Sequence, residues 1–348
     1  MIGRVVVLGA LRGREAAALI VDGQLQDLLV GQLDDVVEFL PGAILRGHVD
    51  RQMKGQGGVF IRLPDGQKGF LREASGLVPG QSVICQVAGR GEPEKALPVT
   101  LRVLFKGRYA IVTPAAPGLN ISRRIKDEES RANLEALARQ GMEGSGFGLI
   151  VRSAAESADE GEIAEEITSL RALSEAVMDD LSGAPELLVD VAGPHEEAWR
   201  EWADPEPDDV AEGPSAFADH GVEEMVDQLL SPRVSLPGGG HMMIEPTRAL
   251  IAIDVNTGPD TSPAASLKAN IAAARDLPRQ LRLRGLGGQI VIDFAPMPKK
   301  DRAALEQQLR SAFKGEAAET SLAGWTPLGN YELQRKRDRV PLADLLKD

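Results

Sequence analysis

The sequence is poor in cysteine and has no long apolar run. Its 348 residues include a single cysteine, Cys85, which excludes an internal disulfide and any zinc site built from several cysteines. No apolar run reaches the length of a membrane span, and the N-terminal segment MIGRVVVLGALRGREAA lacks the pattern of a cleaved signal peptide. We therefore expect a cytoplasmic protein. A chain of this length buries more than one core, so two or three domains are expected.

Basic residues are nearly missing from one segment. Residues 156–212 hold 19 acidic and 2 basic residues, a local charge of −17. The net charge of the whole chain is −13, so the remainder carries +4, with 37 basic and 33 acidic residues. An acidic block of this kind is usually a solvated face or a loose insertion, and it does not exclude a basic groove elsewhere. Residues 201–221, which overlap its end, have the Pro, Gly and acidic composition of a loop.

Two apolar, β-branched runs each end in an aspartate. The run ALIAID ends at Asp254 and the run GGQIVID ends at Asp293, with a helix-forming segment between them. A strand, a crossover helix and a second strand normally form a parallel pair, and ligands gather at the carboxyl ends of such strands. We therefore expect both carboxylates side by side on one sheet edge. With the amide of Asn256 nearby, they suit Mg²⁺ that keeps part of its water shell. The alternative is that each aspartate caps a helix or opens a turn.

The segment between the two aspartates carries two further expectations. Pro278 is expected to interrupt and kink the crossover helix, because proline removes a backbone donor. Three arginines that follow it are expected to bring positive charge toward the second apolar run: Arg279, Arg282 and Arg284.

Short strands separated by Gly and Pro turns follow the first forty residues, a pattern typical of a small barrel. Four segments have this pattern: 43–49, 57–63, 81–89 and 98–105. Upstream, residues 16–30 are predicted to form two strands around an Asp22-Gly23 hairpin turn. Downstream, we expect an amphipathic helix over 126–140, a strand over 185–191 and a helix over 221–230.

The region around the two aspartates resembles the catalytic segment of the ribonuclease E/G family. The similarity is carried by EPTRALIAIDVNTG and NIAAARDLPRQLRLRGLGGQIVIDF, and by TPLGNYELQRKRDR, in which Glu332, Arg335 and Arg337 match the family's terminal element. It implies a mixed α/β (α+β multidomain) chain with an S1-type OB-fold barrel inserted in an RNase H-like subdomain, followed by a DNase I-like catalytic subdomain. The implied parts are 1–38 (first RNase H-like part), 39–104 (S1 domain), 105–183 (5′-sensor region), 184–225 (second RNase H-like part with the acidic loop) and 226–348 (catalytic subdomain).

Phe60 and Phe70 lie ten positions apart within the predicted barrel. Aromatic rings on an OB surface provide stacking platforms for bases, although from composition alone both rings are as well suited to filling the barrel core. The resemblance favours RNA contact, because the family's S1 module carries its RNA-contacting aromatics in these two settings. Lys95 similarly matches a family lysine that precedes the next strand.

The resemblance also identifies a sensor for the 5′ end of RNA. Arg152 and Ser153 match the family's Arg-Thr pair, and Gly107 and Ile111 fall where the backbone wall of the pocket is expected. An arginine fork and a hydroxyl are suitable donors for a phosphate monoester. Without the family, Arg152 is an ordinary exposed charge at a strand end.

These features together predict a Mg²⁺-dependent endoribonuclease that cuts single-stranded RNA. By resemblance, Asp254 and Asp293 hold Mg²⁺, Asn256 bonds the phosphate or a metal-bound water, and the products carry a 5′-phosphate and a 3′-hydroxyl. The alternatives are a catalytically weak RNA-binding or regulatory relative and a metal-dependent DNA nuclease. Because no Cys-Pro-x-Cys element precedes Asp348, any homo-oligomer is expected to form without the family's zinc link.

Overall fold

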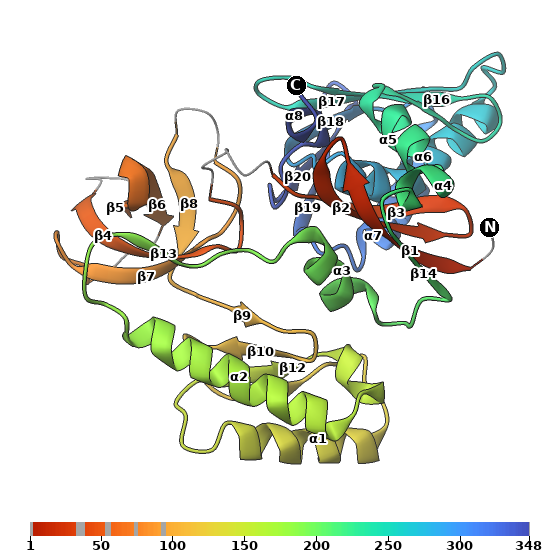
Figure 1. Ribbon diagram of the computed structural model, residues 1–348. Coiled ribbons are helices and arrows are strands. Elements are labelled where there is room, and N and C mark those ends of the chain that lie inside the picture. Colours follow the sequence, from red (N-terminus) through yellow and green to blue (C-terminus); the bar gives the residue numbers. More distant parts are fainter. Residues whose placement is uncertain (1–2, 33–38, 53–56, 73–75, 92–94, 348) are drawn as a thin grey trace. The chain divides into compact units, whose positions relative to one another are not determined.

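The computed structural model describes residues 3–32, 39–52, 57–72, 76–91 and 95–347. The chain is a mixed α/β protein with two compact units (Figure 1). The first unit combines Met1–Leu33 with Asp209–Asp348, and the second consists of Asp34–Asp208. Among the described residues, none of the helices has both the length and the apolar character needed to cross a bilayer.

The second unit contains a closed barrel of five strands, which is consistent with an OB-fold. Its strands are β4 (Ile44–Gln52), β5 (Gly58–Arg62), β6 (Lys68–Arg72), β7 (Ser82–Val87) and β8 (Leu97–Thr100). They pair in the order β4-β5-β6-β8-β7, and β7 pairs back with β4 to close the barrel. The barrel confirms the predicted strand-rich region, and it adds β6, which the strand pattern did not include. A short 3-10 turn η1 (Pro64–Gly66) joins β5 to β6, and β13 (Glu186–Val189) extends the sheet beside β4.

A four-stranded sheet and two long helices form another part of the second unit. The strands are β9 (Phe105–Lys106), β10 (Ala110–Thr113), β11 (Leu119–Ile121) and β12 (Gly148–Val151). The helices α1 (Glu128–Gly141) and α2 (Glu160–Asp179) pack on this sheet around one apolar core. Asp127 caps α1 by accepting a hydrogen bond from the Ser130 amide at 2.8 Å, so the helix predicted over 126–140 is confirmed. The 3-10 turn η2 (Ser153–Ser157) and α3 (Pro194–Trp202) complete the unit.

The acidic block is folded, so its interpretation as a loose insertion is wrong. It contains the twenty-residue helix α2, the strand β13 and the helix α3. The predicted loop over 201–221 is also interrupted by β14 (Asp209–Glu212) and α4 (Ala216–Asp219). Composition suggested a loop because it reports charge and turn residues, whereas the backbone pairing of β14 with the distant β1 decides the structure.

The first unit begins with an antiparallel meander of β1 (Arg4–Leu11), β2 (Arg14–Val21) and β3 (Gln24–Val30). Asp22 and Gly23 have positive φ values of 50° and 76°, the backbone needed for a two-residue hairpin turn, so the predicted hairpin is confirmed. β14 pairs with β1 in parallel. The helices α4, α5 (Val222–Leu230) and α8 (Leu342–Leu345) contribute to the apolar core of this sheet.

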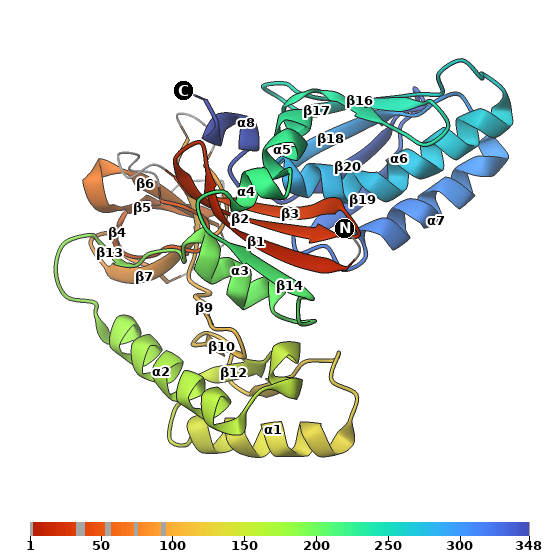
Figure 2. The same cartoon turned by 45° about the vertical axis from the view of Figure 1, so that its right-hand side comes forward.

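A second, six-stranded sheet of the first unit carries the two predicted aspartates. Its order is β15-β16-β17-β18-β20-β19, with bounds Arg233–Ser235, His241–Pro246, Ile251–Asn256, Gly288–Asp293, Tyr331–Arg335 and Thr320–Trp325. The crossover helix α6 (Pro263–Leu283) joins β17 to β18, which are parallel. The helix α7 (Arg302–Phe313) follows the 3-10 turn η3 (Lys299–Asp301) and runs beside α6 along the sheet (Figure 2). One apolar core joins both helices to the sheet.

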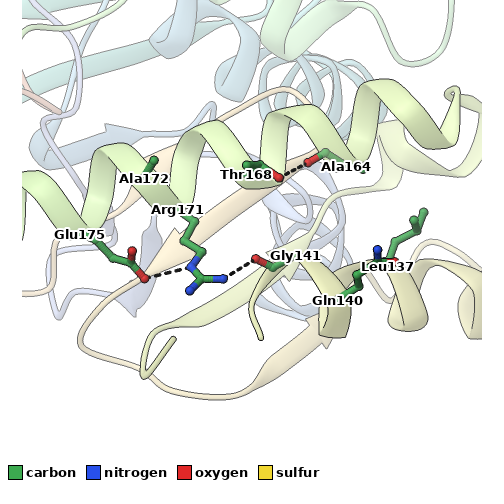
Figure 3. A pocket seen from close by; sticks show the side chains of 8 residues that line it. All are labelled: Leu137, Gln140, Gly141, Ala164, Thr168, Arg171, Ala172 and Glu175. Atoms are coloured by element: carbon green, nitrogen blue, oxygen red, sulfur yellow. Dashed lines mark hydrogen bonds and ion pairs between the residues drawn. The ribbon is translucent and has the colours of Figure 1, made fainter. Parts of the chain in front are cut away.

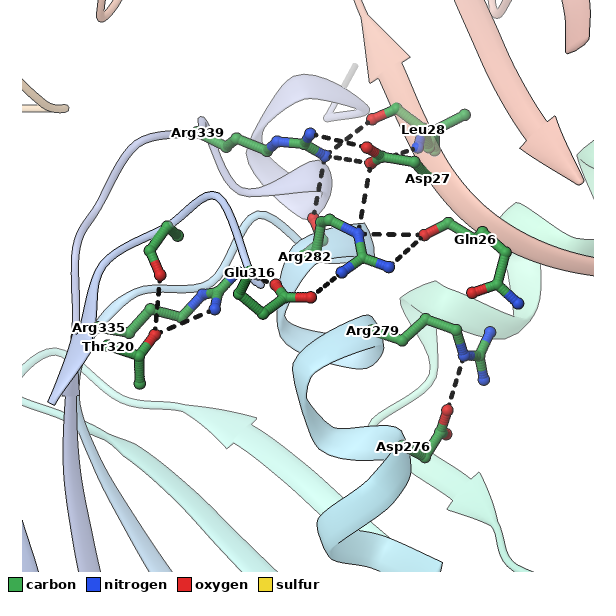
Figure 4. Close-up of polar contacts among 11 residues, drawn as sticks. Gln26, Asp27, Leu28, Asp276, Arg279, Arg282, Glu316, Thr320, Arg335 and Arg339 are labelled. Atoms are coloured by element: carbon green, nitrogen blue, oxygen red, sulfur yellow. Dashed lines mark hydrogen bonds and ion pairs between the residues drawn. The ribbon is translucent and has the colours of Figure 1, made fainter. Parts of the chain in front are cut away.

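Two arginines of α6, Arg279 and Arg282, join this helix to the strand β3 of the other sheet in the first unit (Figure 4). Arg282 donates to the Gln26 carbonyl at 2.8 Å and pairs with Glu316, and Arg279 donates to the Leu25 carbonyl at 2.9 Å. Arg284 is buried and bonds the Ser231 carbonyl at 2.8 Å. The expectation that these arginines provide positive charge for the second aspartate strand is therefore wrong, because carbonyls and carboxylates engage them.

Candidate functional site

The two aspartates are direct neighbours at the carboxyl end of a parallel strand pair. In the register of β17 and β18, Asp254 lies opposite Asp293, as the sequence predicted. Both residues are exposed, whereas the alternating positions Ile253 and Ile292 are buried in the core. Because side chains alternate between the two faces of a strand, the carboxylates project from the face opposite α6 and α7. The exposed edge therefore presents two negative charges to solvent.

Asn256 belongs to the same face and is tied to the first carboxylate. Its Nδ2 donates a hydrogen bond to Oδ2 of Asp254 at 2.7 Å. This bond orients the Asp254 carboxylate and leaves its other oxygen available to a ligand. Neither aspartate is the N-cap of α6 or α7, whose N-caps are Ser262 and Asp301, so the capping alternative is wrong.

A buried asparagine, which the sequence interpretation missed, holds the end of β18 in place. Asn270 of α6 is fully buried and forms two hydrogen bonds with Ala295, two residues after Asp293. Its Nδ2 donates to the Ala295 carbonyl and its Oδ1 accepts from the Ala295 amide, each at 2.9 Å. The backbone that carries Asp293 is thereby fixed to the crossover helix. The sequence does contain a signal for this role, because a polar residue on the apolar face of a predicted helix needs a buried hydrogen-bond partner.

The donor set of this edge suits a hard divalent cation. Two adjacent carboxylates and an amide supply oxygen ligands, and Mg²⁺ typically binds through one or two carboxylates while retaining water. Within the described ranges, no cluster of three or more His, Cys, Asp or Glu side chains has the geometry of a fully protein-made metal site. Cys85 is buried in the barrel, and desolvation raises the pKa of its thiol to about 12. The carboxylate edge is therefore the best candidate for metal binding in the described part of the chain.

Phe60 and Phe70 lie on the outside of the barrel. They are directly opposite each other on β5 and β6, and their ring centroids are 5.5 Å apart at an interplanar angle of 55°. Both are half-buried and absent from the barrel core, which contains their strand neighbours Val59, Ile61 and Leu71. The alternative that they fill the core is therefore wrong. Lys95 is exposed and precedes β8, the strand that pairs with β6.

The four predicted sensor residues gather around the end of β12. Ile111 lies opposite Ile150 in the β10–β12 pair, and Arg152 follows β12 directly. Arg152 Nη1 donates to the Gly107 carbonyl at 2.8 Å, and Ser153 is the next residue along the chain. The resemblance therefore indicated residues that the fold brings together.

Carboxylates of the acidic block already engage the side chains of this cluster. Arg152 Nη2 pairs with Glu201 of α3 at 2.7 Å, and the Ser153 hydroxyl donates to Asp204 at 3.0 Å. The Arg124 guanidinium lies 3.7 Å from the same Asp204 carboxylate. The arginine and the hydroxyl thus have the directional donors that a phosphate monoester needs, and in this structure they bond to acidic side chains.

A further carboxylate builds the turn below this cluster. Glu166 of α2 accepts hydrogen bonds from the amides of Arg108, Tyr109 and Ala110 at 2.7–2.9 Å. A Cβ atom at Gly107 would lie 2.4 Å from Oε1 of Glu166, so the carboxylate fits only because position 107 is glycine. Burial, and then a hydrogen bond to Glu162, raise the pKa of Tyr109. Two acidic residues of α2 therefore have structural roles.

A shallow pocket between α1 and α2 is separate from these residues (Figure 3). Arg171 projects into it, pairs with Glu175 at 2.9 Å and donates to the Gly141 carbonyl at 3.1 Å. None of its eight lining residues is among the predicted site residues, and its one arginine is engaged by protein groups. The carboxylate edge, the aromatic pair and the sensor cluster therefore remain the candidate sites.

Comparisons with known proteins point to one family. A family model described as the ribonuclease E/G family matches residues 105–211 and 208–338. Ribonuclease E of Synechocystis sp. (strain ATCC 27184 / PCC 6803 / Kazusa) is 32% identical over 95% of this chain and 56% of its own length. Ribonuclease E of Nostoc sp. (strain PCC 7120 / SAG 25.82 / UTEX 2576) is 29% identical over 96% of this chain and 56% of its own length. Ribonuclease G of Haemophilus influenzae (strain ATCC 51907 / DSM 11121 / KW20 / Rd) is 28% identical over 95% of this chain and 79% of its own length. The chain thus spans about half the length of the two ribonuclease E proteins.

Proposed function

The chain belongs to the ribonuclease E/G family, and on that premise we propose that it is an endoribonuclease that cuts single-stranded RNA in RNA processing or decay. The observation that carries this proposal is the in-register pair of exposed carboxylates, Asp254 and Asp293, at the carboxyl ends of parallel strands. An exposed pair of like charges in this position stabilises no core, and it is well suited to metal-assisted phosphate chemistry.

In this proposal Asp254 and Asp293 hold Mg²⁺, which when bound supplies an activated water and offsets charge on the scissile phosphate. Asn256 keeps the Asp254 carboxylate oriented through the 2.7 Å hydrogen bond. Its second amide hydrogen is available to a phosphate oxygen or to a water. Asn270 keeps the end of β18, and with it Asp293, in position. The products are a 5′-phosphate and a 3′-hydroxyl.

The barrel is the proposed RNA-binding module of S1 type, with Phe60 and Phe70 as base-stacking platform and Lys95 as a backbone contact. The tilted pair of rings on the outer surface supports this role, because single-stranded nucleic acids bind by stacking bases on exposed aromatics. We assign the sheet of β1–β3 and β14 to an RNase H-like subdomain and the six-stranded sheet to a DNase I-like catalytic subdomain.

Arg152 and Ser153, with the backbone at Gly107 and Ile111, form the proposed sensor for a 5′-monophosphate. Since Glu201 and Asp204 bond to the sensor side chains, a phosphate has to displace two carboxylates before it gains its own hydrogen bonds. This observation favours a weak sensor. A weak sensor also fits a catalytically weak RNA-binding or regulatory relative, which is the second candidate function.

A cleavage assay tests the proposal. A 5′-monophosphorylated, A/U-rich single-stranded RNA is incubated with the chain and Mg²⁺, with EDTA in a parallel sample, and the new ends are mapped. We expect internal cuts that require Mg²⁺ and leave 5′-phosphates. Binding without cleavage identifies the regulatory relative, and equal cleavage of single-stranded DNA identifies a general nuclease.

A further inference from the structure

His241 lies on the same sheet face as the candidate catalytic residues. It is the first residue of β16, which runs antiparallel to β17, and in the register of this pair it lies directly opposite Asn256. Residues directly opposite each other in an antiparallel pair share one face of the sheet. His241, Asn256, Asp254 and Asp293 therefore line one edge, on three neighbouring strands.

The backbone just before His241 approaches the end of β17 and the loop after it closely. A Cβ atom at Gly240 would lie 2.7 Å from the Asn256 carbonyl oxygen, and one at Gly258 would lie 2.4 Å from the Gly239 carbonyl oxygen. Both approaches require glycine, so the loop before His241 packs against the loop after Asn256. The backbone position of His241 beside the carboxylate edge is therefore fixed by the fold.

The two ring nitrogens of His241 differ in their surroundings. The side chain is half-buried, and its Nδ1 is shielded from solvent without a hydrogen-bond partner among the described residues. Buried polar atoms in proteins are nearly always paired, and an exception next to a candidate active site suggests a functional reason for it. Since Nδ1 is shielded, Nε2 is the ring nitrogen that a ligand can reach.

We propose that His241 is a substrate-binding residue whose Nε2–H donates a hydrogen bond to a non-bridging oxygen of the RNA backbone at this edge. The inference rests on the proposed ribonuclease function and adds a residue to that site. The edge carries two carboxylates, so a phosphodiester needs donors beside them, and Asn256 already gives one of its amide hydrogens to Asp254. A neutral imidazole donates through Nε2 without gaining a proton, and a phosphodiester beside the scissile one keeps its geometry and charge during the cut.

The test compares His241→Ala with His241→Gln, whose amide nitrogen reaches about as far as Nε2. Cleavage kinetics are measured with Mg²⁺, and RNA affinity is measured by fluorescence anisotropy in EDTA. We expect His241→Ala to raise both KM and the dissociation constant about tenfold, with kcat changed less than twofold, because the bond forms in the ground state and the transition state alike. His241→Gln is expected to recover most of this loss. Ser235→Ala is the matched control, since Ser235 is exposed and lies opposite His241 on β15.

Three results would overturn the inference. The first is unchanged KM and affinity in His241→Ala, and the second is an equal loss in the Ala and Gln variants. The third is a fall in kcat at constant KM, which would assign the imidazole to the chemical step. If the wild-type chain does not cleave RNA, the proposed function fails, and the affinity comparison in EDTA still decides whether His241 binds RNA.

Discussion

At the scale of single residues, the candidate sites depend on two kinds of side chain. Some are exposed to a ligand, and others form hydrogen bonds with the backbone that positions the exposed ones. Asn270 and Glu166 are the clearest cases, because each satisfies amides at the root of a candidate site. Each such hydrogen bond contributes about 0.5–1.5 kcal/mol while it is made, and each buried partner left unpaired by its loss costs about 1–3 kcal/mol. We therefore expect the main effect of replacing Asn270 or Glu166 to come from the backbone groups that would lose their hydrogen-bond partners.

Replacing Asn270 by Leu is expected to lower both stability and cleavage. The change leaves the buried amide and carbonyl of Ala295 without partners, at a cost of about 1–3 kcal/mol for each group. It also releases the backbone two residues after Asp293. Thermal unfolding and cleavage rates measure the two effects. Gln308→Ala is the control, since Gln308 bonds Arg275 on the exposed surface of the same helix pair. Equal melting temperatures for Asn270→Leu and the control would contradict the role of Asn270.

The sequence identified charged residues whose spacing in the chain reveals their place in a strand. It missed residues whose role depends on contacts with distant parts of the chain. Asp254 and Asp293 were found because each ends an apolar strand, and strand register then places them side by side. The arginines of α6 were misinterpreted, because a charged residue in a sequence does not reveal its partner. Arg282 belongs to a network with Gln26 and Glu316, more than thirty residues away from it in either direction.

At the scale of elements, β5 and β6 present Phe60 and Phe70 as one surface feature. Alternation along a strand decides which face a ring occupies, and the buried positions Val59, Ile61 and Leu71 leave the two rings outside. From the residues alone, the sequence did not decide whether the two rings lie inside or outside the barrel. Residues 63–69 are rich in turn-forming types, so no strand was predicted over β6.

The double substitution of Phe60 and Phe70 by Ala is expected to weaken single-stranded RNA binding, by about 1–3 kcal/mol for each lost stack. The barrel should keep its melting temperature within a few degrees, since neither ring belongs to its core. Anisotropy titration and thermal unfolding separate the two effects. Val78→Ala, which truncates a side chain that is 60% exposed in the same unit, is the control. A destabilised variant with unchanged RNA affinity would argue against the platform.

We expect two carboxylates, Glu201 at the end of α3 and Asp204 just after it, to weaken the response of the proposed sensor. Glu201→Gln combined with Asp204→Asn removes the negative charges that bond Arg152 and Ser153. We expect this variant to prefer 5′-monophosphorylated over 5′-hydroxyl RNA several-fold more than the wild type does, with the difference shrinking as salt is raised. Cleavage rates on the two RNA forms measure the preference.

The matched control for this prediction is Glu196→Gln. Glu196 lies on the same helix but pairs with Arg200 in an exposed i,i+4 bridge. The same gain in the control would indicate a general charge effect, and no gain in either variant would contradict the competition between carboxylates and phosphate.

The helix α6 and the acidic block show why secondary structure predicted from local sequence was only partly correct. Pro278 was expected to interrupt α6, yet the helix continues from Pro263 to Leu283. Proline costs a backbone hydrogen bond, but the apolar face of α6 packs on both the sheet and α7, and tertiary packing provides most of the stability of a helix in a protein. The acidic block likewise folds because α2 buries apolar side chains in the core of its unit, and Glu162 and Glu166 also have partners on β10 and the turn before it.

At the scale of the whole molecule, the chain forms two compact units, and the first of them is made of two separate segments of the sequence. Met1–Leu33 joins Asp209–Asp348 because β1 pairs with β14, some two hundred residues later. Local patterns predict strands and turns but carry no information on which distant strand becomes a partner. The closed barrel was predictable because its strands follow one another, whereas the joining of the N-terminal segment to a distant one was indicated by the family resemblance and not by local patterns.

The central claim is that the carboxylates of Asp254 and Asp293 together perform metal-assisted cleavage of RNA. The most direct measurement is the rate of Mg²⁺-dependent cleavage by Asp254→Asn and Asp293→Asn, with Asp260→Asn as control. Asp260 lies in the loop after β17, where its carboxylate bonds the Ser262 amide at 2.9 Å, so the control makes the same charge change off the edge. We expect both edge variants to lose cleavage by at least about a hundredfold with an unchanged melting temperature, while the control keeps its rate. Wild-type rates in either edge variant at limiting Mg²⁺ would contradict the claim.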